Sequence, residues 1–180
     1  MTLGVHDDLW ALIRTRYAGR TAVTQAVRSE LNRLRRSHQT AVAKLAKRAA
    51  LDTTWQGPGV LLNSDEERTA VESLRGKISA GRPGHPNEHL GEATCILHAI
   101  AVGGQIIMED YDARVWAINL GVTAVVSVHS FLYALFKNGV VSLDEAVTYI
   151  DAIHEASRGP KITVEELQAG RHRMGRVGRP

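Results

Sequence analysis

The feature that most constrains the fold is a nearly continuous apolar run at residues 122–128. Such a run is typical of a parallel strand that is covered on both faces. A shorter apolar run at 105–108 precedes it, and a helix-length segment at 113–119 separates the two. Helices that alternate with short apolar strands predict an α/β fold, here a three-layer sandwich with a mainly parallel central sheet.

The same order extends toward both ends of the chain. Short β-prone stretches are expected at 21–24 and 60–62. Ser64 and Ser142 each precede a glutamate by three residues, the pattern of a capping box at a helix start, and Gly103 is expected to end a helix. Apolar spacing predicts helices over these segments: 7–17, from Val27 to about Ala50, 64–78, 90–101, 130–137 and from 142 onward.

Length and composition favour one globular domain. The 180 residues, 44% of them hydrophobic, suit a single domain over 1–170, followed by a basic, disordered tail at 171–180. The single cysteine excludes an internal disulfide framework and is typical of a reducing compartment. No secretory signal opens the sequence, and its longest apolar stretch is too short to span a bilayer. We therefore expect a cytoplasmic protein with no membrane partner.

Charge is distributed unevenly along the chain. Residues 1–50 carry ten Lys/Arg and three acids, whereas residues 51–170 carry eight and sixteen. The basic third could bind a polyanion such as RNA, and a solvated helix face is the alternative explanation. The candidate nucleic-acid-binding residues are Arg33, Arg35, Arg36, Lys44, Lys47 and Arg48.

Acidic residues follow the predicted strand at 105–108. In open parallel sheets, sites form beyond the carboxyl ends of strands, and this strand delivers Glu109, Asp110 and Asp112 to that place. Asp also starts helices, so Asp112 is the favoured helix cap, whereas a functional and a structural role are equally weighted for Asp110.

Two further acids are candidates. Glu92 lies near the start of a predicted helix, where an acid more often complements the helix dipole than binds a ligand. Glu30 is the only acid among the basic residues of its helix, and a salt bridge to Arg28 or Arg33 is the alternative to a ligand role.

Taken together, these segments resemble PIN-domain proteins, particularly small prokaryotic members related to VapC-type toxins. The resemblance spans about residues 9–157 and is strongest over 90–143. Three segments carry it: AVRSEL at 26–31, LGEA at 90–93 and IIMEDYDAR at 106–114.

The resemblance implies a metal-dependent ribonuclease that hydrolyses phosphodiesters with carboxylate-bound Mg²⁺ or Mn²⁺. It assigns Glu30, Glu92 and Asp110 to the family's second, third and fourth acids, with Asp112 as an auxiliary ligand. Three crowded carboxylates repel one another, so such a cluster calls for a cation. An antitoxin protein and a homodimer are further expectations from the toxin members.

One departure separates the chain from this family. Members begin with an apolar strand that ends in an Asp, and neither Asp7 nor Asp8 takes that position. We therefore expect a sheet of changed order or a dimer that covers the exposed edges. The alternative function is a catalytically incomplete PIN-like domain that binds nucleic acid or protein.

The histidines and the cysteine are weaker candidates. His85 and His89 are four residues apart in a Gly/Pro-rich loop, a poor setting for Zn²⁺. His98 interrupts an apolar face, and His129 follows a predicted strand, where loop packing is favoured over phosphate contact. Cys95 is expected to be a small core residue.

Overall fold

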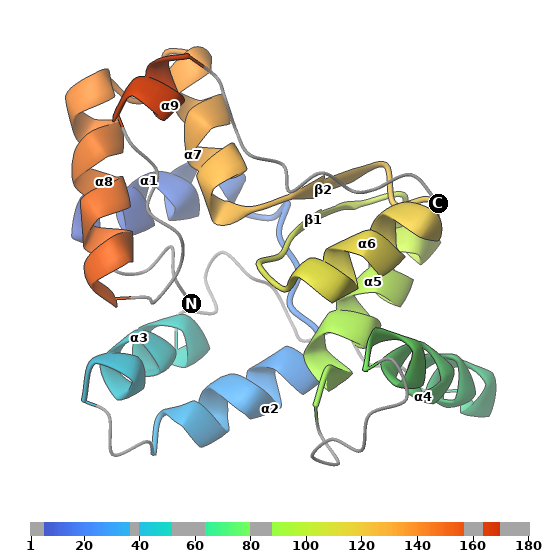
Figure 1. Ribbon diagram of the computed structural model, residues 1–180. Helices are drawn as coiled ribbons and strands as arrows, with labels where there is room; N and C mark the ends of the chain where they lie inside the picture. Colours follow the sequence, from blue (N-terminus) through green and yellow to red (C-terminus); the bar gives the residue numbers. More distant parts are fainter. Residues whose placement is uncertain (1–5, 37–39, 52–63, 80–87, 157–163, 170–180) are drawn as a thin grey trace.

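The computed structural model describes residues 6–36, 40–51, 64–79, 88–156 and 164–169, and this part of the chain is mainly helical (Figure 1). Its elements in chain order are α1 (Asp7–Tyr17), α2 (Gln25–Leu34), α3 (Thr40–Leu51), α4 (Asp65–Ile78), α5 (Leu90–Val102), β1 (Gln105–Ile107), α6 (Tyr111–Asn119), β2 (Ala124–Val126), α7 (Val128–Lys137), α8 (Leu143–Ala156) and α9 (Val164–Gln168). No helix among these residues is long and apolar enough to cross a membrane.

The predicted three-layer α/β sandwich is wrong. Within the described residues the only sheet has two strands, β1 and β2, which run parallel with Ile106 opposite Val125. Ile106 is buried, but its neighbour Ile107 is 44% exposed, so β1 is covered well on one face only. A two-stranded sheet cannot form the central layer of a sandwich.

Helix caps account for much of the missing strand content. The run at 122–128 was expected to be one strand, but Ser127 caps α7, and the helix begins at Val128. Of the expected strand at 21–24, only Thr24 forms a strand-type bridge. Its side chain accepts a hydrogen bond from Val27 N, so this residue also caps α2. The expected strand at 60–62 and the tail at 171–180 lie outside the described residues.

The prediction of one continuous helix from Val27 to about Ala50 is also wrong, because two separate helices cover this segment. Helix α2 ends at Leu34, residues 35–36 form a turn in which Arg36 N donates to Arg33 O, and α3 begins at Thr40. The turn lets α2 and α3 pack on each other, so that Leu31 shares a buried cluster with Ala46. One straight helix would hold these residues about 22 Å apart, since each residue adds about 1.5 Å.

Several helix boundaries follow the sequence signals. Helix α1 matches the predicted segment, with acids in its first turn and arginines in its last, which complements the helix dipole. Ser64 and Glu67 form a capping box through two 3.0 Å hydrogen bonds. Gly103 ends α5 in a left-handed conformation (φ 64°), which glycine adopts without the steric cost of a Cβ. These predictions are confirmed.

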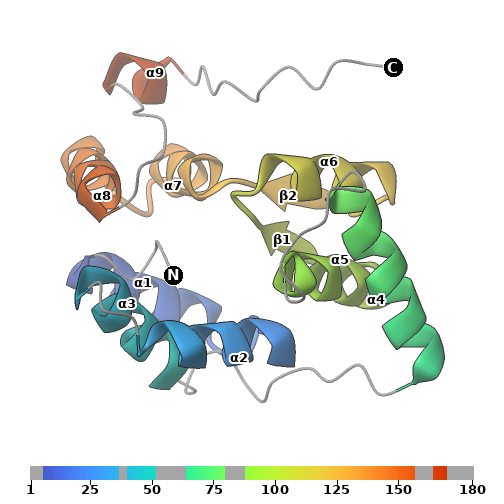
Figure 2. The ribbon, with the colours of Figure 1, turned by 60° about the horizontal axis from the view of Figure 1, so that its bottom comes forward.

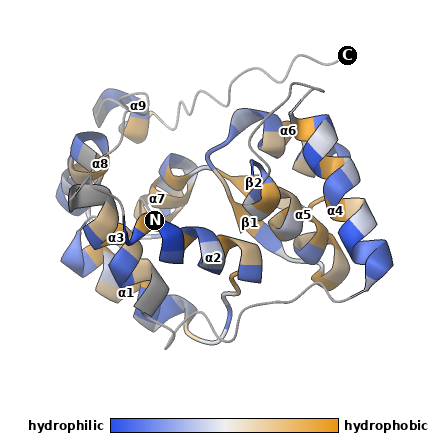
Figure 3. Ribbon diagram, turned by 90° about the horizontal axis from the view of Figure 1, so that it is seen from below, coloured by the Kyte–Doolittle hydropathy of each residue, from blue (hydrophilic) through white to orange (hydrophobic). Residues whose placement is uncertain are grey.

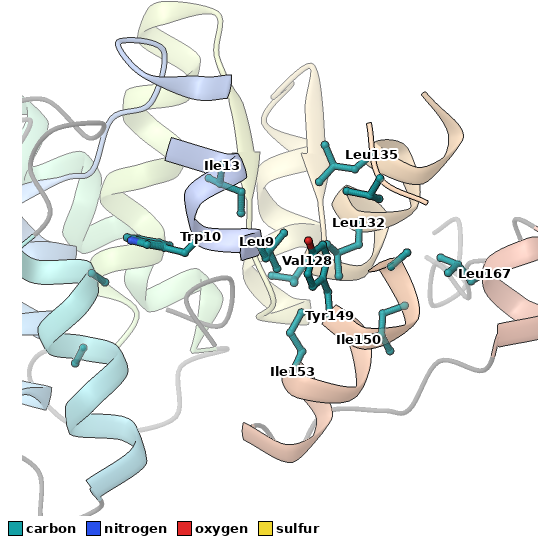
Figure 4. Packing of buried hydrophobic residues seen from close by; sticks show 14 of the residues in the cluster. Leu9, Trp10, Ile13, Val128, Leu132, Leu135, Tyr149, Ile150, Ile153 and Leu167 are labelled. Atoms are coloured by element: carbon teal, nitrogen blue, oxygen red, sulfur yellow. The ribbon is translucent and has the colours of Figure 1, made fainter. Parts of the chain in front are cut away.

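Buried apolar side chains form two clusters. The first joins α1, α3, α7, α8 and α9 and includes Leu9, Leu132 and Ile153, all nearly inaccessible (Figure 4). The second lies among α4, α5, α6 and the sheet, and includes Ile96 and Ile106. Figures 2 and 3 show the helices of the first cluster to one side of the sheet and α4–α6 to the other.

Helix α2 connects the two clusters. Its Leu31 belongs to the first cluster. Thr24, which caps its start, hydrogen-bonds Thr94 of α5, a helix of the second cluster. A second connection runs from the end of β1 to α7, where Val128 N donates to the Glu109 carboxylate. The second connection uses Glu109, one of the acids that follow β1.

Candidate functional site

Two consecutive acids at the carboxyl end of β1 each hold the start of a helix. Ala113 N donates to Asp110 Oδ1 at 2.7 Å, so Asp110 is the N-cap of α6. Glu109 accepts from Val128 N at the start of α7. Asp112 lies exposed in the first turn of α6, so the expectation that it is the cap is wrong: α6 begins two residues earlier than predicted.

Glu30 and Glu92 approach each other from different helices. Glu30 is exposed on α2, and Glu92 is half-buried in the first turn of α5. A Cβ placed on Gly91, the residue before Glu92, would lie 3.4 Å from Glu30 Oε2. The Glu30 carboxylate therefore lies near Gly91, at the start of α5.

Burial and neighbouring charge raise the pKa of the Glu92 carboxyl. Loss of hydration is the largest cause, and the negative charges of Glu30 and Asp110 act in the same direction. A hydrogen bond from its own backbone N–H and the nearby His89 oppose the rise. The three acids thus share one electrostatic neighbourhood, although they come from α2, α5 and the β1–α6 turn.

The donor chemistry of these acids suits Mg²⁺ or Mn²⁺, because hard divalent cations take oxygen ligands. The mutual repulsion at Glu92 is also what a bound cation would relieve. Among the residues that the structure describes, however, no three acidic, histidine or cysteine side chains lie close enough together to hold a metal ion. Charge and donor type fit a cation, and the side-chain positions do not close a coordination shell around one.

The basic candidates fall into two groups. Arg33, Arg36, Lys44 and Lys47 are exposed on α2, on the turn that follows it and on α3. Arg35 is also exposed, and its guanidinium donates to Asn32 Oδ1 at 3.2 Å. These positions suit contact with a polyanion.

Arg48 has a structural role instead. It is half-buried and forms an ion pair with Asp7 at the start of α1, which lowers the pKa of the Asp7 carboxyl. The pair joins α3 to α1 in the first cluster. Arg48 is therefore the candidate least suited to contact nucleic acid.

The histidines take separate positions. His89 precedes α5 with a left-handed backbone (φ 55°), and its Nε2 lies 3.8 Å from Glu88 Oε1. His129 is buried in the first turn of α7, with its ring 5.7 Å from that of His154. His98 is half-buried on α5, and His85 lies outside the described residues.

Sequence reasoning missed two residues at this site. Glu109 was expected only as a member of an acidic run, and its partner Val128 lies nineteen residues away, beyond any local pattern. Gly91 was noted only as part of a motif. A glycine in the first turn of a helix, beside a candidate ligand, was the available signal that another element approaches closely.

No protein-family model, curated protein or solved structure matches this chain. The resemblance to PIN-domain proteins therefore stays a prediction from the sequence.

Proposed function

We propose that this chain is a metal-dependent ribonuclease whose Glu30, Glu92 and Asp110 attract and hold Mg²⁺ or Mn²⁺. The observation that carries the proposal is the shared electrostatic neighbourhood of the three acids, in which Glu30 and Asp110 both raise the pKa of Glu92. Separated segments supply these acids: Glu30 comes from α2, Glu92 from the first turn of α5 and Asp110 from the turn after β1.

Each acid has an oxygen to offer. Glu30 is exposed, and Glu92 is partly desolvated, which strengthens its attraction for a cation. The cap made by Asp110 engages Oδ1, and a carboxylate has a second oxygen that can serve as a ligand. Bound there, Mg²⁺ or Mn²⁺ would supply activated water and stabilise the charge that develops on a phosphodiester.

RNA is the proposed substrate because basic side chains lie on the same helix as Glu30. Arg33 is one helical turn beyond Glu30, and Arg36 follows the end of α2. Lysines and arginines that neutralise phosphates give affinity that depends on salt and little on sequence. Lys44 and Lys47 on the adjacent α3 extend this basic surface.

Cleavage of a fluorescently labelled, mixed-sequence RNA oligonucleotide tests the proposal. We expect cleavage by the full chain in Mn²⁺, loss of cleavage in EDTA, and a fall of at least about a hundredfold in Glu92→Gln, as for loss of a group that acts in the transition state. Glu66→Gln, at an exposed position of α4, is the matched control and should cleave normally. Equal rates in Mn²⁺ and EDTA would contradict the proposal.

A second candidate is a nucleic-acid-binding domain without catalysis. It is favoured by the commitment of Asp110 to the cap of α6 and by the lack of a three-ligand group among the described residues. This candidate predicts salt-dependent RNA binding that Mn²⁺ leaves unchanged, with no cleavage. An antitoxin partner and a homodimer stay predictions from the family resemblance.

A further inference from the structure

Four large apolar side chains are exposed where α5 and α6 end. Ile100 and Val102, in the last turn of α5, are 42% and 61% exposed. Ile118 and Leu120, at the end of α6, are 47% and 41% exposed. We call these four residues the neutral patch. Apolar residues that are exposed singly are common on protein surfaces, whereas a group of them marks a surface that another molecule covers.

Helix α6 shows that the patch is not left over from packing of the core. The residues that α6 buries are the small Ala113 and Ala117, while its larger Ile118 is exposed. A helix that served only the core would bury its large apolar residues and expose polar ones. The apolar side chains at this end of α6 therefore suit contact with a molecule outside the described chain.

The pairing of β1 with β2 brings the two helix ends together. Gln105 lies opposite Ala124, so the connections that lead into both strands lie side by side, and Thr123 Oγ1 donates to Gly104 O at 3.5 Å. These connections follow directly on the ends of α5 and α6 (Figure 1). The neutral patch therefore lies at the amino end of the parallel pair, and Asp110 lies at the other end.

The segments around the patch carry no charge over two long stretches. Residues 93–108 and 115–136 contain no Asp, Glu, Lys or Arg, although these four types make up 23% of the chain. Charge returns at Lys77 of α4, whose amine lies 5.7 Å from the centre of the Trp116 ring of α6. An apolar centre without charges and a charged border are the usual composition of a protein–protein interface.

We propose that a second copy of this chain packs on the neutral patch and forms a two-fold symmetric dimer. In such a dimer the same surface of both copies meets, so a charged residue near the axis would face its own like charge. A surface without charge avoids this repulsion and is complementary to itself. It has no charge to attract an acidic or basic partner, and it lacks the lysines and arginines that hold proteins on anionic lipid.

Burial of the four apolar side chains against their counterparts supplies the free energy of association. The dimer leaves the end of the sheet that carries Asp110 free, so the inference does not rest on the proposed function. A chain that dimerises without cleaving RNA would contradict only the proposed function, and a monomer that cleaves RNA would contradict only the dimer.

Analytical ultracentrifugation of the full chain over a concentration series tests the proposal. The wild type should change from a monomer of 19.7 kDa to a dimer of twice that mass as its concentration rises. Val102→Glu should weaken dimerisation by about a hundredfold or more, because it places like charges opposite each other. Tyr111→Glu is the matched control, since Tyr111 is 45% exposed at the opposite end of α6, and it should dimerise as the wild type does.

A second substitution at the same position separates loss of the dimer from loss of the fold. Val102→Lys alone should also be monomeric where the wild type is dimeric. An equimolar mixture of the Val102→Glu and Val102→Lys chains should dimerise, because the introduced carboxylate of one copy then faces the introduced amine of the other. A mixture that stays monomeric, while both variants melt as the wild type does, would overturn the two-fold arrangement.

Three further results would overturn the inference. The first is a wild-type chain with a dimer dissociation constant above about 1 mM. The second is a dimer that Val102→Glu leaves unchanged, because another surface would then form it. The third is a monomeric wild type that binds phosphatidylcholine vesicles through Val102, which would assign the neutral patch to a lipid surface.

Discussion

Glu92 is the residue at which the candidate site and the stability of the fold conflict. Burial raises the pKa of its carboxyl, and Glu30 and Asp110 add to the rise. The folded chain therefore binds this proton more tightly than the unfolded chain does. The resulting stability is complete below the ordinary pKa of glutamate and is lost as the pH rises through the raised pKa.

Replacing Glu92 with glutamine should remove this pH-dependent loss. Without metal, Glu92→Gln should melt higher than wild type at pH 7, by an amount on the order of 2 °C, and the gap should close toward pH 4. Thermal unfolding followed by circular dichroism across that pH range checks the prediction. A glutamine variant that is less stable than wild type at pH 7 would contradict the electrostatic conflict.

Asp110 has two roles in this account, and two substitutions separate them. Asparagine caps helices about as well as aspartate, so Asp110→Asn should keep the metal-free melting temperature, whereas Asp110→Ala should cost about 1 kcal/mol. Both should lose the stabilisation by Mn²⁺. If the asparagine variant keeps that stabilisation in full, Asp110 is a cap and not a ligand.

The acids were predictable from the sequence, and their partners were not. Asp110 and Asp112 fit a helix start equally well by residue type, and the choice depends on where the Ala113 N–H lies. The role of Glu109 depends on Val128, which only the pairing of β1 with β2 brings near. The local sequence shows which residue types favour a helix start, but it does not show these contacts between distant residues.

At the scale of elements, α3 combines a structural basic residue with exposed ones. Arg48 pairs with Asp7 of α1, while Lys47 beside it is exposed. Adjacent positions on a helix point about 100° apart, so neighbours can face the core and the solvent. The charge pattern alone gave both residues the same role.

We expect Lys47→Ala to affect RNA binding and Arg48→Ala to affect the stability of the fold. Lys47→Ala should weaken RNA binding at all sequences, reduce the salt slope by about one unit and leave stability unchanged. Arg48→Ala should lower the melting temperature, because it removes the contact with α1, and should change the salt slope little. Fluorescence anisotropy over a salt series and thermal melts test both, and a reversed pattern would refute the division.

Element boundaries were predictable where a local cap sets them. The side chains of Ser64 and Glu67 cap the start of α4. The left-handed backbone of Gly103 ends α5. The turn at residues 35–36 was not predictable from a local signal, and the two helices on either side of it bury Leu31 and Ala46 in the same cluster. Apolar spacing continues across that turn, so periodicity alone favours one helix.

At the scale of the molecule, the predicted sheet is where sequence reasoning failed most. The apolar run at 122–128 has the composition of a covered parallel strand, yet its middle residues, Ala124–Val126, are only half-buried. The apolar surface is instead covered within two clusters of helices. The packing partner of an apolar segment depends on the arrangement of the whole chain. A local sequence pattern does not include that information.

The central claim is that Glu30, Glu92 and Asp110 attract a divalent cation to one place. Isothermal titration calorimetry of Mn²⁺ into the full chain tests it most directly. We expect saturable binding at one site in the wild type, lost in Glu92→Gln and kept in Glu66→Gln. At one hundred times its dissociation constant, Mn²⁺ should stabilise the fold by about 2.7 kcal/mol. Heats of binding that are the same in wild type and Glu92→Gln would contradict the account.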